Sequence, residues 1–253
     1  MTAPTPVVDL HGRVALVTGA ARGLGRAIAV RLHELGASVG VNTRDAARSE
    51  ALAAELGARA LAVPGDISAD GVPEALVARV LAQFGRLDIV VNNAAHAEST
   101  RFGELDAAEF RAALEVNMVA PFLLTKAALP AMRAQQYGRV INVSSLAGRM
   151  VSTLGGVHYT ASKTGLLGLT RASAKELGRF GITINAICPG MIDTELTREH
   201  ASPERLSQLA AGYPIPRLGT AREVADLIAF VASDAAGYIT GASFDINGGD
   251  LMM

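Results

Sequence analysis

The stretch Val14-Ala-Leu-Val-Thr-Gly-Ala-Ala-Arg-Gly-Leu-Gly25 decides the fold. Its first five residues are mostly aliphatic or β-branched and predict a strand, and glycines follow at positions 19, 23 and 25. Glycines let a backbone turn tightly against a pyrophosphate, and the start of the next helix offers unpaired N–H groups. The spacing G-x-x-x-G-x-G differs from the G-x-G-x-x-G dinucleotide fingerprint, and a purely structural turn is the alternative. The position directly after the first strand favours a phosphate cradle.

The rest of the chain repeats this strand–helix alternation. Stretches with helical spacing, such as Ile28, Leu32 and Leu35, separate short β-branched runs. Such alternation predicts a single Rossmann-like α/β domain over residues 1–253, with a doubly wound parallel sheet of about seven strands and helices on both faces. Beyond the first strand, the candidates are 38–42, 60–64, 89–92, 139–143, 183–187 and 243–246.

Composition narrows the function classes. The chain has 253 residues and a net charge of −1, which predicts no broad attraction to nucleic acid or anionic membranes. The single cysteine, Cys188, excludes an intramolecular disulfide and any multi-cysteine metal site, and fits a reducing compartment. Residues 1–13 lack the apolar run of a signal peptide, and no uninterrupted apolar stretch reaches about 18 residues. We expect a cytoplasmic protein without a metal site.

The end of the second predicted strand bears on the cofactor. Dinucleotide folds place the residue that meets the adenosine ribose about 20 residues after the glycine turn, and NAD sites commonly have an acid there. This chain has Asn42, Thr43 and Arg44 at that point. Arg22 and Arg44 could both face a 2′-phosphate, which favours NADP(H). In the alternative, Arg44 is solvated and Asp45 turns in to bind NAD(H).

Tyr159 and Lys163 are spaced as neighbours on one helix face. An ammonium at roughly 4 Å, with an effective dielectric near 20, would favour the phenolate by about 4 kcal/mol, or about three pKa units. A phenol tuned in this way could act as a general acid or base. The spacing alone also occurs by chance, with an exposed tyrosine and a solvated lysine, so the other motifs decide.

Taken together, the motifs resemble the short-chain dehydrogenase/reductase family in its single-domain branch. They are the glycine turn, Asp66-Ile67, Asn92-Asn-Ala-Ala95, Asn117, Asn142-Val-Ser-Ser145, Tyr159–Lys163 and Pro189-Gly190. The resemblance extends from Leu10 to Gly249 and implies an NADP(H)-dependent oxidoreductase. It would transfer a hydride between the cofactor and a small-molecule ketone or secondary alcohol.

The resemblance implies a catalytic role for four residues. Tyr159 is the acid or base, Lys163 lowers its pKa, Ser145 donates to the substrate oxygen, and Asn117 holds a water that links Lys163 to solvent. Ser144 is the alternative to Ser145, and Asn117 could instead be a satisfied polar residue within a helix.

With the cradle and the two arginines, the resemblance also implies a cofactor site. Asp66 could instead cap a helix, the Thr194 hydroxyl could face water, and Asn92 would line the middle of the cofactor beside Ala94. The full set of expected cofactor-binding residues is Gly19, Ala21, Arg22, Gly23, Leu24, Gly25, Asn42, Arg44, Asp66, Ile67, Asn93, Ala94, Tyr159, Lys163, Pro189, Gly190, Ile192 and Thr194.

Three features concern the substrate side. Ala95 replaces a glycine that is usual in the family, and the interval from Ser145 to Tyr159 is one residue longer than usual, which we place in the loop 148–157. Residues 190–216 are rich in proline and polar residues and predict a substrate-side lid, with an ordered surface loop as the alternative. Candidate pocket residues are His96, Met150, Leu154, His158, Met191 and Tyr213; for the histidines, a surface or core position is at least as plausible.

The substrate itself is left open. The chain is most similar to the 3-oxoacyl-carrier-protein reductase type, yet Gln136 and Phe180 stand where that type usually has basic docking residues. A free ketone, sugar or biosynthetic intermediate is at least as good a candidate. An NAD-dependent sugar or alcohol dehydrogenase and a non-catalytic dinucleotide-binding regulator are the rival functions. The resemblance implies a homotetramer or homodimer.

Overall fold

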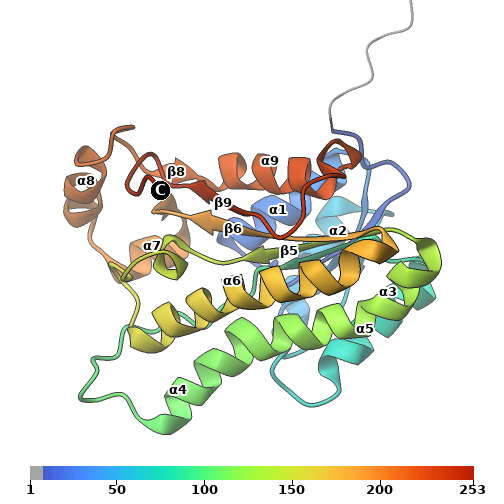
Figure 1. The fold of residues 1–253 in the computed structure, drawn as a ribbon, viewed down its shortest axis with the longest axis horizontal. Helices are drawn as coiled ribbons and strands as arrows, with labels where there is room; N and C mark the ends of the chain where they lie inside the picture. Colours follow the sequence, from blue (N-terminus) through green and yellow to red (C-terminus); the bar gives the residue numbers. More distant parts are fainter. Residues whose placement is uncertain (1–7) are drawn as a thin grey trace, which may run out of the picture.

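A seven-stranded parallel sheet forms the centre of the molecule in a computed structural model that describes residues 8–253 (Figure 1). The strand order is β3-β2-β1-β4-β5-β6-β9, so the chain crosses over between β3 and β4. The strands are β1 (Val14–Val17), β2 (Ser38–Val41), β3 (Ala60–Ala62), β4 (Ile89–Asn92), β5 (Gly138–Val143), β6 (Ile182–Pro189) and β9 (Ser243–Ile246). The predicted doubly wound α/β fold and all seven strands are confirmed. The interpretation of residues 1–13 falls partly on residues 1–7, which lie outside the described residues.

Helices cover both faces of the sheet, and β1 shows why. Ala15 and Val17 pack into the core that contains α1 (Gly23–Glu34) and α9 (Ala221–Ala232). Val14 and Leu16 point the other way, into the core shared with α3 (Val72–Phe84) and α5 (Ala120–Gln135). A strand buried on both sides needs apolar residues at every position, as this one has. The remaining long helices are α2 (Ala46–Leu56) and α6 (Val157–Leu177), and short 3₁₀ turns occur at Leu146–Gly148, Gly178–Phe180 and Asp234–Ala236.

One continuous helical stretch runs from α4 (Ala107–Leu114) through a π-helical turn (Glu115–Val119) into α5. By length and composition it could cross a membrane, but buried helices of soluble proteins pass the same test. Here α5 packs against α3 and contributes Leu124, Ala128 and Met132 to the core, and 33% of the apolar window is buried. The π turn places Asn117 on the buried side, and such turns are common at functional sites.

The segment 190–216 contains two short helices, which the sequence interpretation missed. They are α7 (Glu195–His200) and α8 (Pro203–Ala211), framed by a small parallel pair of β7 (Ile192–Asp193) and β8 (Gly219–Thr220). Each begins at a hydroxyl cap, where Thr194 accepts from the Thr197 amide and Ser202 from the Arg205 amide. Hydroxyl residues before a first helical turn are a readable start signal. Both helices lie at the carboxyl end of the main sheet (Figure 1); their role as a lid stays a prediction.

Candidate active site

The glycine turn is packed too closely to admit side chains at its key positions. Gly19 has a φ of +65°, and a Cβ added at Gly25 would lie 2.1 Å from the Gly19 carbonyl oxygen. The absence of a Cβ therefore lets α1 start directly against the end of β1. Within the described residues, no side chain caps the start of α1. Its first N–H groups are available to an anion, as a phosphate cradle requires.

A cavity of about 690 Å³ runs from this turn along the carboxyl ends of the strands. Its walls include the full set of expected cofactor-binding residues, from Gly19 to Thr194, together with Ser145. The shape fits an extended dinucleotide, because glycine-rich backbone stands at one end and Tyr159 and Lys163 stand at the other. Asn92 and Asn117 are not among the lining residues.

At the part of the cavity expected to hold the adenosine ribose, the Asp45 carboxylate is engaged with the protein, whereas Arg44 has no ion pair among the described residues. The Asp45 carboxylate caps α2, accepting from the amides of Ala47 (3.0 Å) and Arg48 (3.4 Å), and also pairs with the Arg48 side chain (3.3 Å). Arg44 lines the cavity and forms no ion pair within residues 8–253. Arg22 pairs with Glu199 of α7, so its guanidinium already holds a carboxylate. Among the described residues, Arg44 is thus an arginine at this end without an ion pair, although its charge contributes to lowering the pKa of the nearby Asp66.

Several expected cofactor residues shape the cavity through backbone contacts. The Asn42 side chain donates to the carbonyls of Val63 (2.9 Å) and Gly65 (3.1 Å), which fixes the loop after β3. The Asn93 side chain donates to the Thr18 carbonyl (2.9 Å), which fixes the glycine turn. Asn42 and Asn93 thus use their side-chain amides on the protein itself.

Asp66 does not cap a helix, because α3 begins after Gly71 and no side chain among the described residues caps it. One of its carboxylate oxygens accepts from the amide (3.0 Å) and the hydroxyl (2.6 Å) of Ser68, and these hydrogen bonds lower the pKa of Asp66. The carboxylate therefore organises the turn that precedes α3, while Asp66 still lines the cavity. Thr43, Arg48 and Gly65 line it too, and the sequence interpretation missed them. Thr43 and Gly65 follow strand ends closely, which was the available signal, whereas Arg48 lies in the first turn of α2.

Tyr159 and Lys163 lie one turn apart at the start of α6; Lys163 is buried and Tyr159 is partly buried in the cavity wall. The Lys163 ammonium donates to the Val143 carbonyl (2.7 Å) and lies 5.7 Å from the centre of the Tyr159 ring. Burial raises the pKa of Tyr159, while a hydrogen bond with the Ser145 side chain lowers it. Burial lowers the pKa of Lys163 to about 8. The one hydrogen bond of the Lys163 ammonium within residues 8–253 is the bond to β5, and the expected effect of its charge on the Tyr159 phenol stays a prediction.

The structure separates the two candidate serines. The Ser144 hydroxyl is buried and donates to the Lys163 carbonyl (2.9 Å), so it fastens β5 to α6. Ser145 caps the 3₁₀ turn, accepting from the Ala147 amide (3.1 Å), and its side chain also reaches Tyr159. Ser145 is therefore the serine whose side chain lies beside Tyr159, and its role as a donor to the substrate stays a prediction.

The Asn117 side chain is fully satisfied by contacts other than Lys163. Its oxygen accepts from the His96 amide (2.8 Å), and its nitrogen donates to the His96 carbonyl (2.9 Å) and the Ser162 hydroxyl (2.9 Å). Among residues 8–253 no hydrogen bond joins Asn117 to Lys163. The Asn117 side chain is therefore a hydrogen-bonded polar group within a helix, as in the alternative interpretation. The water that would link Lys163 to solvent stays a prediction.

The substrate side differs from expectation in detail. Ala95 is exposed in the cavity, and among the described residues other than glycine only Gln136 has a positive φ, so the backbone at Ala95 needs no glycine. His96, Leu154 and Met191 line the cavity, whereas Met150, His158 and Tyr213 do not. The loop before Tyr159, where we placed the additional residue, supplies the wall at 151–155.

Comparison with known proteins agrees with this geometry. The profile of a family described as enoyl-(acyl carrier protein) reductase matches residues 19–250. The chain belongs to the short-chain dehydrogenase/reductase family. As a member of that family it is an oxidoreductase, which confirms the resemblance seen in the motifs.

Relatives in the short-chain dehydrogenase/reductase family match along almost the full chain. The 3-oxoacyl-[acyl-carrier-protein] reductase FabG of Pseudomonas aeruginosa is 40% identical over 248 residues, covering 97% of this chain and 100% of that protein. Nodulation protein G of a Rhizobium species is 37% identical over 245 residues, covering 97% and 99%. A solved structure of a putative gluconate dehydrogenase from Agrobacterium tumefaciens superposes with a TM-score of 0.91 at 32% identity, covering 98% of this chain and 100% of that one.

Proposed function

We propose that the protein uses NADP(H) to reduce a ketone to a secondary alcohol, or to run the reverse oxidation. The observation that carries the proposal is one cavity that begins at a glycine cradle and ends at Ser145, Tyr159 and Lys163. The cradle fits a pyrophosphate because Gly25 leaves no room for a Cβ and the start of α1 carries no side-chain cap. When bound, the nicotinamide supplies or accepts the hydride.

The chain's own residues then handle the substrate oxygen and the proton. Ser145 and Tyr159 are both positioned to donate hydrogen bonds to a carbonyl oxygen at the end of the cavity, which polarises it for attack. Burial raises the pKa of Tyr159, so its phenol stays protonated at neutral pH and can give its proton to the developing alkoxide. Lys163 keeps a positive charge nearby below pH about 8, which favours the phenolate that remains.

The Tyr159→Phe variant tests this mechanism. Removal of the acid should lower kcat by a factor on the order of 10² to 10⁴ in a ketone assay with NADPH, while the Kd for NADPH changes little. Ser144→Ala is a matched control that alters a hydroxyl outside the reacting groups and should leave kcat much higher than Tyr159→Phe does. Unchanged turnover in Tyr159→Phe would contradict the mechanism. If both the wild-type and the Tyr159→Phe protein bind the cofactor but turn over no ketone or alcohol, the result would instead support the alternative function of a non-catalytic regulator.

The preference for NADP(H) is supported by how the charges at the ribose end are used. Asp45 is occupied as the cap of α2, whereas Arg44 is exposed and has no ion-pair partner within the described part of the chain. The Arg44→Asp variant should therefore lose NADPH affinity and gain relative preference for NADH, measured as the ratio of kcat/KM values. Arg179→Asp is a control that changes the charge by the same amount away from the cavity. A wild-type preference for NADH would contradict the assignment.

Two substrate classes deserve direct comparison. The 40% identical relative is named a 3-oxoacyl-[acyl-carrier-protein] reductase, and the superposed structure is titled a putative gluconate dehydrogenase. The substrate end is partly apolar, with Val151, Leu154 and Met191 in its walls, which favours a ketone with an aliphatic part over a sugar acid. A panel of 3-oxoacyl thioesters, simple ketones and sugar acids, assayed with NADPH and in reverse with NADP⁺ or NAD⁺, separates the two classes. Faster oxidation of a sugar acid with NAD⁺ would establish the NAD-dependent dehydrogenase alternative.

We further propose that the protein works in the cytoplasm as a homotetramer or homodimer, without nucleic acid or membrane partners. The exposed Phe122 on α5 and Val157 at the start of α6 support an association through these helices. Light scattering of the purified protein measures the oligomeric state, and a monomer at micromolar concentration would contradict this part of the proposal.

A further inference from the structure

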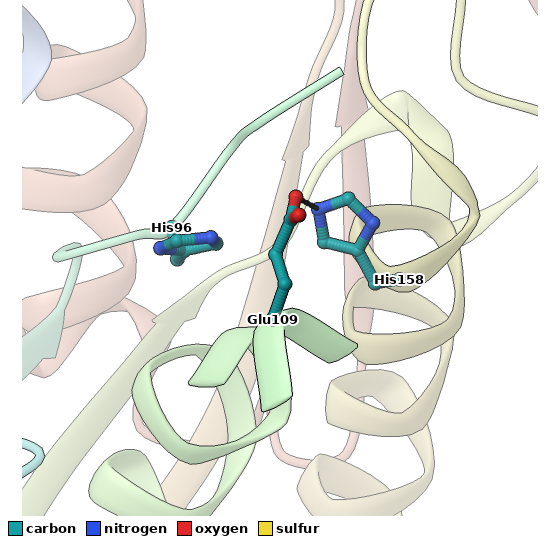
Figure 2. Close-up of side chains that lie close together, drawn as sticks. All are labelled: His96, Glu109 and His158. Carbon is teal, nitrogen blue, oxygen red and sulfur yellow. Dashed lines mark ion pairs between the residues drawn. The ribbon is translucent and has the colours of Figure 1, made fainter. Parts of the chain in front are cut away.

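Three side chains from separate segments converge beside the active site. His96 follows β4, Glu109 lies on α4 and His158 lies in the first turn of α6; Figure 2 shows the Glu109 carboxylate between the two imidazole rings. One ligating atom from each residue lies within 4.8 Å of the other two. The Nε2 atom of His158 is 3.6 Å from a Glu109 carboxylate oxygen, which is too long for a hydrogen bond.

His158 is buried and His96 is partly buried, and both imidazoles have buried nitrogens without a hydrogen-bond partner among the described residues. The His158 side chain is 0% exposed, and neither of its ring nitrogens has a hydrogen-bond partner among residues 8–253. The Nε2 atom of His96 is also buried and lacks a partner within the same residues. Leaving a buried polar atom unpaired costs about 1–3 kcal/mol, and here both rings that carry such atoms flank one carboxylate. This pattern calls for a group that accepts nitrogen lone pairs.

The surroundings hold these side chains in place. The Thr100 hydroxyl donates at 2.6 Å to Oε1 of Glu109, the oxygen that also lies 3.6 Å from Nε2 of His158, and this contact orients the carboxylate toward the histidine. Both backbone groups of His96 are held by the Asn117 amide (2.8 and 2.9 Å). A Cβ on Gly156 would lie 2.6 Å from the His158 ring, so a glycine at this position makes room for the imidazole. Outer contacts of this kind orient the ligands of metal sites.

We propose that His96, Glu109 and His158 bind a divalent transition-metal ion of the zinc class. Two imidazole nitrogens and one carboxylate suit zinc better than magnesium or calcium, which prefer all-oxygen ligands. In a tetrahedral site with bonds of about 2.0–2.2 Å, ligating atoms are roughly 3.3–3.5 Å apart, so the three groups need to move together by only about 1 Å. Water can supply the fourth ligand, because the Glu109 side chain is 27% exposed.

The ion would join the segments that frame the substrate end of the cavity. His96 lines the cavity, while its Nε2 atom is buried. His158 directly precedes Tyr159, and the loop before α6 is already tied to the 96–106 segment, because the Gly156 amide donates to the Glu98 carbonyl at 2.9 Å. The metal would therefore fix the substrate-side loops and leave the proton transfer to Tyr159.

Zinc titration of the untagged, chelator-treated full-length protein tests the proposal. We expect one Zn²⁺ per chain by calorimetry, and a visible absorption band when Co²⁺ replaces it. Glu109→Gln keeps the size of the side chain and should weaken zinc binding by at least about 100-fold, the upper end of the loss seen for outer-shell partners. His158→Gln should do the same. His33→Gln and Glu104→Gln, which alter the same residue types outside the cluster, should bind zinc as the unaltered protein does.

Two outcomes of the zinc titration would contradict the proposal. It is wrong if the unaltered protein binds no stoichiometric zinc, or if the folded Glu109→Gln protein binds zinc with unchanged affinity. Circular dichroism of each variant before titration identifies any loss of fold. If His158→Gln fails to fold, Glu109→Gln alone decides, since it preserves an acceptor for Thr100 and leaves His158 in place.

Discussion

At the scale of single residues, Lys163 shows the conflict between stability and chemistry. Its ammonium is enclosed by protein, and its one hydrogen bond among the described residues goes to the Val143 carbonyl. Burial lowers the pKa from 10.5 to about 8, so the folded protein disfavours the very charge that the mechanism uses. Enzymes commonly accept such local instability in their active sites.

The Lys163→Met variant should therefore be inactive but more stable at neutral pH. The difference between the folded and unfolded pKa values corresponds to about 3 kcal/mol, and loss of the bond to Val143 reduces the expected gain to about 2 kcal/mol at pH 7. The wild-type protein gains stability as pH rises from about 8 to 10.5, because there the unfolded chain holds the proton and the folded one does not. The advantage of the variant should accordingly disappear near pH 10.5.

Urea unfolding of both proteins at pH 7 and pH 10 measures this effect. Lys175→Met, a change at an exposed position of the same helix, is the control and should shift stability little at either pH. A Lys163→Met protein that is less stable than wild type at pH 7 would show that burial of this ammonium carries no net cost.

The spacing of Tyr159 and Lys163 predicted that the two side chains share one face of a helix, but it did not predict how deeply they are buried. Tyr159 and Lys163 were predicted from four-residue spacing and do share one face of α6. The direction of the Tyr159 pKa was wrong, because burial depends on β5 and the cavity walls rather than on the helix alone. The different contacts of Ser144 and Ser145 appear only when β5 and α6 are placed side by side, and the role of Ser145 stays a prediction.

At the scale of elements, the strand-to-helix turn after β1 has almost no free space. Gly25 faces the Gly19 carbonyl oxygen at 2.1 Å and the Asn93 amide nitrogen at 2.5 Å, measured from the position of an added Cβ. A methyl group at this position must push α1 away from β1 or displace Asn93. Either movement disturbs the N–H groups that we expect to hold the cofactor phosphates.

Gly25→Ala should thus lose both stability and cofactor affinity. Overpacking of a tight contact typically costs about 1–3 kcal/mol, and we expect a loss of about 2 kcal/mol in the free energy of unfolding. The Kd for NADPH, measured by fluorescence titration, should rise at least about tenfold, which corresponds to about 1.4 kcal/mol. Gly103→Ala is the control, because nothing lies within 4 Å of an added Cβ at that exposed position. Unchanged NADPH affinity in Gly25→Ala would contradict the assignment of this turn as the phosphate cradle.

Elements with strong local signals were the ones predicted from sequence. The seven strands of the main sheet are short apolar runs between turns, and each is present within a few residues of its expected bounds. α7 and α8 were missed because Pro203, Pro214 and Pro216 suggested irregular structure over the whole segment. Pro203 in fact begins α8, since the first helical position needs no amide hydrogen.

At the scale of the whole molecule, the two ends of the sheet have different tasks. The carboxyl ends of the strands carry the cavity, whereas the amino ends are closed by a charged cluster. Asp88 is fully buried and accepts from the Val14 amide (2.9 Å) and from Arg86 (2.6 and 2.8 Å). Arg13 lies 3.6 Å from Asp88, pairs with Asp234 at 3.0 Å and stacks on the Tyr137 ring at 3.7 Å.

This cluster could not be predicted from sequence, for the same reason as the His96, Glu109 and His158 group. Its members come from segments separated by up to 221 positions, and no short motif relates them. Only the sheet order, which places β1 between β2 and β4, brings Arg13 next to Asp88. Long-range polar clusters therefore appear only after the topology is known, whereas the glycine turn and the Tyr159–Lys163 pair are each contained in one segment.

Because the charged cluster and the cavity lie at opposite ends of the sheet, we predict that Asp88→Ala lowers the free energy of unfolding without altering catalysis. Removal of the carboxylate leaves the Val14 amide unpaired and the Arg13 and Arg86 charges without their buried partner, which should cost about 3–5 kcal/mol in urea unfolding. Because the cluster lies at the opposite end of the strands from the cavity, the kcat/KM of the folded fraction should stay within about twofold of wild type, well below the tenfold change that 1.4 kcal/mol produces. Asp234→Ala is the matched control: its carboxylate is 67% exposed, so its ion pairs should contribute at most about 1 kcal/mol. A large loss of kcat/KM in folded Asp88→Ala would show that the two ends of the sheet are coupled after all.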